Sequence, residues 1–216
     1  MCGRYRRTSD RQRIAEAFQV EEGLEELYLG PDENISPGSV QPVIVLNEHG
    51  DRTIEQMRWG FKLPDRLLFV ARSEEILQKP FWKDRFAKSR VIVPADSFFD
   101  WKEVEKGAKP KYEFNVPGRE PFGMAGVWSP WKNPKTGEWE KIFAIVTTAP
   151  NEVMQPIKER QPSILEPREY AEYLADTERP PIHLFRVLPA ENLRSHLVEG
   201  AEKKQTTCEP GLFDNL

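Results

Sequence analysis

Residues 40–61, which read VQPVIVLNEHGDRTIEQMRWGF, decide the fold class of this chain. Residues 40–46 and 53–61 are rich in apolar side chains, whereas residues 47–51 between them (NEHGD) are polar and include a glycine. Two apolar runs joined by about five turn-forming residues are typical of a β-hairpin. The sequence therefore predicts two neighbouring antiparallel strands in this segment.

Other segments have the same strand-like character, and fewer have helical periodicity. Ser9 followed by Gln12 matches a capping box and predicts a helix with Ile14 and Phe18 on one face. Many short sequential strands with interspersed helices predict an α+β fold built on a largely antiparallel, curled sheet. Strands are predicted over residues 2–6, 91–93, 97–103, 112–116, 122–128, 139–147 and 184–188, and further helices over residues 73–78, 81–87 and 167–175.

The composition indicates one ordinary domain. The 216 residues carry a formal net charge of -4 and two cysteines, Cys2 and Cys208, so the fold cannot rely on a disulfide framework. We expect a monomeric domain over residues 1–200 and a C-terminal tail over residues 201–216. No stretch approaches the roughly 18 apolar residues of a membrane span, and no apolar run follows the first charged residues. These observations predict no membrane partner, no signal peptide and a cytoplasmic location.

Positive charge is concentrated near the first residues. Residues 1–13 contain five arginines and one acid, Asp10, and the arginines follow shortly after Cys2. One interpretation is a solvated basic face, and the other is an anion-binding site, which the clustering favours. The mild overall acidity argues against a uniformly basic nucleic-acid-binding protein but is compatible with a local basic groove.

Cys2 provides two adjacent nucleophiles once Met1 is removed, which a small side chain at position two allows. Its α-amine then has an unperturbed pKa of about 7.7–8.0, and its thiol has one of about 8.5. The amine attacks an aldehyde to give a Schiff base, and the thiol then closes on the imine carbon to give a thiazolidine ring. The alternatives are an ordinary cysteine and the nucleophile of an N-terminal-nucleophile amidohydrolase. Amidotransferases of that type continue into an apolar strand, whereas this chain continues with arginines.

Seven ordered segments carry a resemblance to a known family. They are residues 1–5 (MCGRY), 34–38 (NISPG), 58–61 (RWGF), 71–74 (ARSE), 93–102 (VPADSFFDWK), 147–151 (TTAPN) and 157–162 (IKERQP). In their order and spacing they resemble the SOS response-associated peptidase (SRAP) family of abasic site processing proteins. The resemblance implies a curled, mostly antiparallel, barrel-like β core with flanking helices and a basic groove at the N-terminus.

The resemblance also implies a DNA-damage response protein that acts at the nucleoid. Members of the family bind single-stranded DNA and trap abasic sites covalently, which makes Cys2 the nucleophile after autoproteolytic removal of Met1. Peptidase and lyase-like activities, with no cofactor and no metal, are expected with this role. The resemblance assigns DNA binding to Arg4, Arg72 and Arg160 through phosphates, to Trp59 through base stacking (or, alternatively, core packing), and to Asn34 and Pro37 through the loop over the active site.

Three positions depart from the family pattern. Val70, Asp100 and Lys158 stand where asparagine, glutamate and histidine are usual. A histidine supplies a group that titrates near neutral pH, whereas a lysine supplies a cation unless burial lowers its pKa. One hypothesis is that Lys158 stabilises the opened sugar or a phosphate while Asp100 moves the proton. The other is that the chemistry is slow and the chain mainly binds DNA, as a regulatory member.

The last residues indicate a second partner. Residues 211–213 (GLF) resemble the short peptides by which bacterial repair proteins bind the replication sliding clamp, with Leu212 and Phe213 as the contact residues. The alternative is a docked or disordered tail without a partner. Cys208 has no assigned role.

Overall fold

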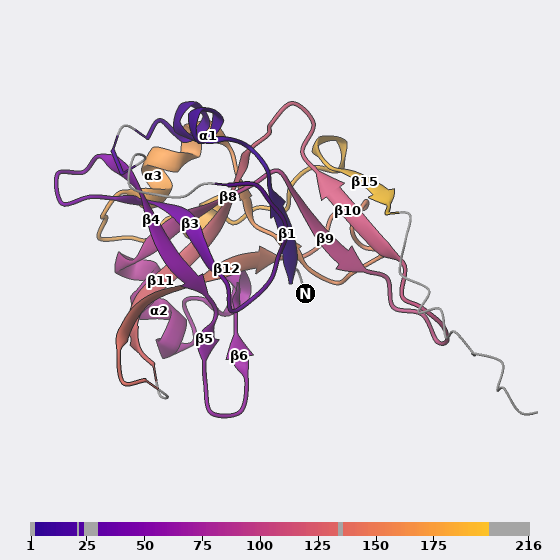
Figure 1. Ribbon diagram of the computed structural model, residues 1–216, viewed down its shortest axis with the longest axis horizontal. Helices are drawn as coiled ribbons and strands as arrows, with labels where there is room; N and C mark the ends of the chain where they lie inside the picture. Colours follow the sequence, from indigo (N-terminus) through magenta and orange to yellow (C-terminus); the bar gives the residue numbers. More distant parts are fainter. Residues whose placement is uncertain (1–2, 21, 24–29, 134–135, 199–216) are drawn as a thin grey trace, which may run out of the picture.

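The computed structural model describes residues 3–20, 22–23, 30–133 and 136–198, and five of its strands form a closed ring (Figure 1). They are β3 (Val40–Leu46), β4 (Arg52–Trp59), β8 (Arg90–Ala95), β11 (Phe122–Lys132) and β12 (Trp139–Thr148). Because β12 pairs with both β11 and β4, the order β4–β3–β8–β11–β12 closes into a barrel. The β12–β4 pair is parallel and the other four are antiparallel, since five strands cannot alternate in direction around a closed ring.

The β3–β4 hairpin confirms the prediction made from residues 40–61. Its antiparallel register is continuous along both strands. The side-chain oxygen of Asn47 accepts hydrogen bonds from the backbone N–H groups of His49 and Asp51, each at 2.9 Å. Asparagine is favoured in turns because its side chain bonds the backbone in this way. The turn therefore fixes the register of the two strands.

Both faces of the barrel wall are buried, which explains why its strands are so apolar. Val43 and Val45 belong to a buried cluster that includes Tyr5 and Phe98 of a second sheet. Ile44, which lies between these valines, belongs to another cluster, whose members include residues of all three α-helices. The helices are α1 (Arg11–Phe18), α2 (Pro80–Lys88) and α3 (Tyr170–Leu174). A strand with one face toward each cluster has little need for polar residues.

Residues 4–7 form an interior strand of a second sheet, which has five strands. Its order is β15 (Arg194–Leu197), β10 (Lys111–Asn115), β9 (Ser97–Trp101), β1 (Arg4–Arg7) and β2 (Asp32–Ile35), and all its pairs are antiparallel. Only Asp96 separates β8 of the barrel from β9 of this sheet. The two sheets are therefore connected directly, and β1 lies between β9 and β2.

Short elements complete the fold, whose α+β, mostly antiparallel and curled architecture confirms the predicted class. Strand β7 (Val70–Arg72) runs parallel to β12, and β5 (Phe61–Lys62) pairs with β6 (Leu67–Leu68). In the part of the chain that the structure describes, no helix is long and apolar enough to cross a membrane. The remaining elements are β13 (Gln161–Pro162), β14 (Ile164–Leu165) and the 3-10 helices η1 (Ser73–Glu75), η2 (Pro167–Glu169), η3 (Ile182–Leu184) and η4 (Ala190–Asn192).

The predicted capping box at Ser9 is wrong. Helix α1 is capped by Asp10, whose carboxylate accepts a hydrogen bond from the Arg13 backbone N–H at 2.9 Å. Ser9 instead donates its backbone N–H and its hydroxyl to the carboxylate of Asp96, which is buried. A buried carboxylate needs donors, and Ser9 meets that need.

The strand predicted over residues 184–188 is wrong as well. Helix η3 ends at Leu184, and Phe185 packs against the rings of Phe86 and Tyr173 without joining a sheet. Leu184 and Phe185 pack in the cluster that includes the helices, Leu188 lies in the other buried cluster, and Val187 is exposed. A short sequence window cannot distinguish such an apolar run from a strand. Strand β15, which was not predicted, lies further along the chain and is exposed at every position.

Candidate active site

The pairing of β1 with β9 sets the position of the candidate active site. Arg4 lies opposite Phe99, so residue 4 meets β9 one position before Asp100. The Asp100 side chain is 4% exposed, and the Nζ atom of Lys158 lies 3.9 Å from its Oδ1 atom. The structure thus brings together two of the residues predicted to be catalytic. The third, Cys2, lies outside the described residues, as do Leu212 and Phe213.

A hydrogen-bonded turn after β12 holds the backbone of Lys158. The side-chain oxygen of Asn151 accepts hydrogen bonds from the backbone N–H groups of Val153 and Met154, at 3.1 and 3.0 Å. The backbone N–H of Lys158 then donates to the carbonyl oxygen of Met154 at 2.9 Å. The turn is therefore fixed at both of its ends, and the lysine side chain starts from a defined position.

Asp100 is a carboxyl group whose pKa lies above its usual value. The main cause is burial, which disfavours the charged form. A hydrogen bond from the Trp101 backbone N–H, at 2.9 Å, and the positive charge of Lys158 act in the opposite direction. The protonated form of Asp100 is accordingly more accessible than that of an exposed aspartate, which suits a group that exchanges protons.

Lys158 is a cation in this site. Its Nζ atom lies 2.8 Å from Oε1 of Glu103, and this hydrogen bond raises the lysine pKa more than burial lowers it. Glu103 also pairs with Lys109, and the two lysines lower its pKa to about 2. Burial therefore does not convert Lys158 into a substitute for a neutral histidine. Glu103 is not predicted from the sequence, because nothing in its local pattern distinguishes it from the neighbouring Glu105.

Arg4 and Asn34 are in contact across the β1–β2 pair. The Nη1 atom of Arg4 donates to the Asn34 side-chain oxygen at 3.0 Å, and the bond is exposed. Pro37 follows in the turn after β2, beside Gly38, whose N–H donates to the Trp59 carbonyl oxygen at 2.7 Å. The structure therefore places Arg4 and Asn34 together at the surface, with the Pro37 turn attached to the barrel.

Arg72 and Arg160 lie close together on the barrel side of the molecule. Arg72 is opposite Thr147 in the β7–β12 ladder, and Arg160 donates from Nη2 to the carbonyl oxygen of Thr147. Each arginine has an acidic partner: Arg160 pairs with Glu74 at 2.8 Å, and Arg72 lies 3.7 Å from Glu75. Arg72 and Arg160 therefore both lie against Thr147 of β12, and their predicted binding of DNA phosphates stays a prediction.

Trp59 is a core residue, so the prediction that it stacks on a base is wrong. Its side chain is 0% exposed, and its indole N–H donates to the Phe69 carbonyl oxygen at 2.9 Å. Its ring meets that of Tyr5 edge-on, with centroids 5.2 Å apart, and lies parallel to that of Phe143. Since no face of the ring reaches solvent, the alternative of core packing holds.

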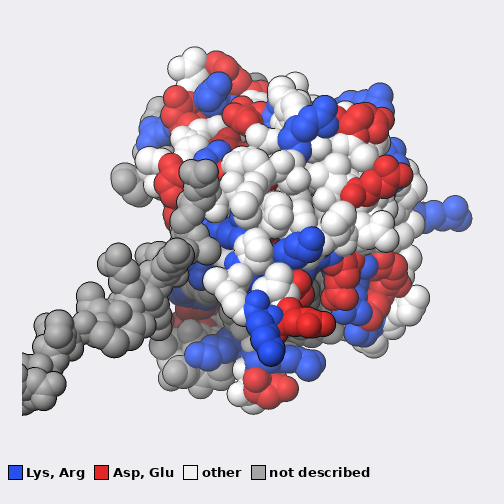
Figure 2. Space-filling model, turned by 90° about the vertical axis from the view of Figure 1, so that its right-hand side faces the viewer, with Lys and Arg blue, Asp and Glu red and all other residues white. Residues whose placement is uncertain are grey.

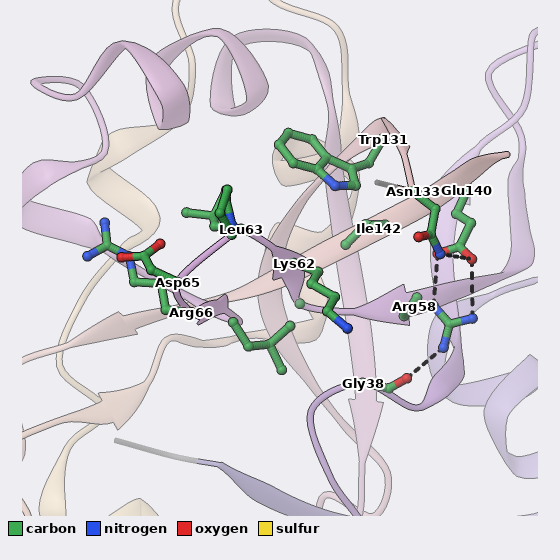
Figure 3. Close-up of a pocket in the computed structure, with 13 residues that line it drawn as sticks. Gly38, Arg58, Lys62, Leu63, Asp65, Arg66, Trp131, Asn133, Glu140 and Ile142 are labelled. Atoms are coloured by element: carbon green, nitrogen blue, oxygen red, sulfur yellow. Dashed lines mark hydrogen bonds and ion pairs between the residues drawn. The ribbon is translucent and has the colours of Figure 1, made fainter. Parts of the chain in front are cut away.

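Two clefts have similar volumes, and the slightly smaller one is lined by residues of the candidate site. A cleft of 660 Å³ lies between the β5–β6 hairpin and the ends of β11 and β12, and Arg58 at its edge is bound by Glu140 and the Gly38 carbonyl oxygen (Figure 3). None of the residues predicted to be catalytic lines it. A second cleft, of 620 Å³, is lined by residues that include Glu103 and Lys158.

Basic and acidic side chains are interspersed near this part of the molecule. Figure 2 shows the face toward the right of Figure 1, where β9, β10 and β15 lie, and its Lys and Arg side chains alternate with Asp and Glu. An acidic side chain also lies next to each of three predicted site residues, Arg72, Arg160 and Lys158. Among the described residues, no group of three or more His, Cys, Asp or Glu side chains could hold a metal ion.

Comparisons with known proteins give a consistent result. The chain is 27% identical over 225 residues to the abasic site processing protein YoqW of Bacillus subtilis, with both chains covered in full. It is 29% identical to the abasic site processing protein HMCES of Gallus gallus, over 83% of this chain and 65% of that one. A crystal structure of a Bacteroides thetaiotaomicron protein has the same fold, with a TM-score of 0.79 at 20% identity over 92% of this chain and 93% of that one.

A family model matches most of the chain. The model is that of the SOS response associated peptidase (SRAP), and it matches residues 1–202. This range includes both sheets and the Asp100–Lys158 pair. The chain therefore belongs to the SRAP family.

Proposed function

We propose that this protein binds single-stranded DNA and traps abasic sites covalently through Cys2, after the Met1–Cys2 peptide bond has been hydrolysed. Family membership and the names of the relatives support the general activity. The observation that carries the proposal for this chain is the β1–β9 pairing, with Arg4 opposite Phe99. Two peptide units join Cys2 to Arg4, and a chain spans at most about 3.6 Å per residue. The covalent chain therefore limits the distance between Cys2 and Arg4 to about 7 Å.

The proposed reaction needs no external oxidant or reductant. The α-amine of Cys2 adds to the aldehyde carbon of the abasic sugar, and the resulting carbinolamine loses water to give a Schiff base. The Cys2 sulfur then bonds to the imine carbon, the thiol proton passes to the imine nitrogen, and a thiazolidine ring results. Asp100 accepts and returns protons in these steps. The Lys158 ammonium stabilises negative charge that develops on the opening sugar.

DNA binding in this proposal uses arginines that already have partners. Arg4, next to Asn34, and the Arg72–Arg160 pair would bind phosphates on either side of the abasic sugar. Glu74 and Glu75 compete with phosphate for Arg160 and Arg72. We therefore expect binding to be sensitive to salt and weaker than that of an arginine site without acidic neighbours.

A crosslinking experiment tests the proposal. The full-length protein with Met1 removed is incubated with single-stranded DNA that contains one abasic site, and the products are separated under denaturing conditions. We expect an adduct with the wild type, none with Cys2→Ala, and none with an intact strand of the same sequence. Absence of an adduct with the wild type would overturn the proposal.

The crosslinking experiment and two further assays distinguish the other candidate functions. The cationic Lys158 and the acid-paired Arg160 favour a binding or regulatory member with slow chemistry, which would show reversible DNA binding without an adduct. An amidohydrolase that uses Cys2 would hydrolyse glutamine in the absence of DNA. Analysis of the mature protein by mass spectrometry, with Cys2→Ala for comparison, tests whether Met1 removal depends on Cys2.

We also propose that residues 207–216 bind the replication sliding clamp through Leu212 and Phe213. The support is the Gly-Leu-Phe segment of the sequence. A peptide of residues 207–216 should bind the clamp saturably, and a peptide with Phe213→Ala should bind more weakly. Lack of saturable binding at micromolar clamp would reject the interaction.

A further inference from the structure

We propose that Glu103 is a positioning residue for Lys158. It holds the lysine ammonium on the solvent side of Asp100, at a distance that leaves the Asp100 carboxyl able to exchange a proton. The inference rests on the proposed function for its chemical meaning, because Asp100 moves the protons in that scheme. The geometry on which it depends is independent of the scheme.

Lys158 is shared unequally between two carboxylates. Its Nζ atom is 2.8 Å from Oε1 of Glu103 and 3.9 Å from Oδ1 of Asp100. The first distance is that of a charge-assisted hydrogen bond, and the second is too long for one. The Glu103 side chain is 61% exposed, whereas that of Asp100 is 4% exposed. The ammonium is therefore hydrogen-bonded to the outer carboxylate and acts on the inner one through space.

Glu103 is itself fixed by the hairpin that carries it. It lies in the connection between β9 and β10, where the Lys102 N–H donates to the Pro110 carbonyl oxygen at 2.9 Å. Its second oxygen, Oε2, pairs with Lys109 from the other side of the same connection. With one oxygen on each lysine, the Glu103 carboxylate connects the β9–β10 hairpin to the turn that carries Lys158.

The charged groups around Asp100 and Lys158 determine how Glu103 affects the ionisation of Asp100. Among the described residues, Lys158 is the charge that acts on Asp100, while Glu103, Asp100 and Glu159 act on Lys158. Tyr112 of β10 is the residue opposite Asp100. Without the negative charge of Glu103, the ammonium is held less strongly on the outer side and can bind Asp100 directly. A direct ion pair favours the ionised carboxylate and makes it a weaker base.

The variant Glu103→Gln tests this role. The rate of adduct formation is measured in single-turnover experiments across pH, for the full-length protein and DNA with one abasic site. We expect the acidic limb of the profile to move to lower pH by about one pH unit, since an opposite charge at contact distance lowers a carboxyl pKa by roughly 1–3 units. Glu103→Asp, which keeps the negative charge, should shift the profile less than Glu103→Gln does. Glu105→Gln, an exposed acid of the same connection, is the matched control.

A second measurement separates this inference from the proposed function. The Asp100 carboxyl carbon is followed by NMR as pH changes and is assigned by its loss in Asp100→Asn. The Asp100 titration should move to lower pH in Glu103→Gln, whether or not an adduct forms. An unchanged titration, or an equal shift in Glu105→Gln, would overturn the positioning role. A shifted titration in a protein that forms no adduct would overturn only the proposed function.

Discussion

Arg160 and Glu74 form an ion pair with two parallel hydrogen bonds, from Nη1 to Oε1 and from Nη2 to Oε2, each 2.8 Å long. The Arg160 side chain is 12% exposed, and its interaction with Glu74 lowers the pKa of that carboxyl. A carboxylate presents the same pair of acceptor oxygens to a guanidinium as a phosphate does. If Arg160 binds DNA, a phosphate must therefore take the place that Glu74 occupies in this structure.

Replacing Glu74 should strengthen DNA binding. In Glu74→Gln the competing charge is removed, and the amide oxygen still accepts one hydrogen bond from Arg160. Partly exposed ion pairs contribute about 0.2–1 kcal/mol, so we expect binding of single-stranded DNA to tighten by about 1.4- to fivefold at low salt. Fluorescence anisotropy with a labelled oligonucleotide gives the affinity. Glu178→Gln, an exposed acid remote in sequence, is the control, and equal affinities for the two variants would exclude the competition.

Asp100→Asn should form the adduct more slowly and, above the folded-state pKa of Asp100, be more stable than the wild type. Removing the group that moves protons is expected to slow adduct formation by about 10²- to 10⁴-fold. Because burial raises the pKa of Asp100, the folded state binds a proton more readily than the unfolded state does. The contribution of this group to stability is therefore greatest at low pH and is lost as pH rises through its folded-state pKa. Above that pKa, Asp100→Asn should have a higher Tm than the wild type. Equal Tm values at every pH would contradict the assigned effect of burial.

Asp96 should be among the most sensitive positions for stability. Its buried carboxylate accepts hydrogen bonds from the backbone N–H groups of Thr8 and Ser9 and from the Ser9 hydroxyl. Asp96→Ala leaves the two buried Ser9 donors without an acceptor, which costs about 1–3 kcal/mol for each unsatisfied group. We expect a loss of roughly 2–6 kcal/mol in urea unfolding. Asp84→Ala, on the exposed face of α2, is the control, and a loss no larger than that of the control would contradict this role.

The alternation of apolar and turn-forming segments was enough to predict most strands and the fold class. The hairpin of residues 40–61 was recognised because register and turn chemistry are both local. The capping residue of α1 was misassigned because the pattern of Ser9 and Gln12 is also local, whereas the true partner of Ser9 is Asp96, 87 residues away. A short window contains no information about such a partner.

The residues of the candidate site were predicted where a sequence segment resembles the family pattern. Asp100 and Lys158 were identified by the segments that contain them, and the structure places them together. Glu103 was missed because its role arises from a turn 55 residues further along the chain. The sequence does not decide between base stacking and core packing for Trp59, because its burial depends on Tyr5, Phe69 and Phe143, which come from three separate segments.

Restoring histidine at position 158 should give the reaction a new pH dependence. The pKa of Lys158 is raised, so the lysine stays charged across neutral pH and contributes no titration there. A histidine titrates near pH 6.5, so adduct formation by Lys158→His should acquire an inflection at about that pH. Lys158→Met, which removes the charge, should slow the reaction at least about tenfold. The rates come from single-turnover crosslinking to DNA with one abasic site. A fast wild-type reaction that histidine leaves unchanged would eliminate the slow-chemistry hypothesis. A slow wild-type reaction that histidine accelerates would show that the lysine itself limits the chemistry.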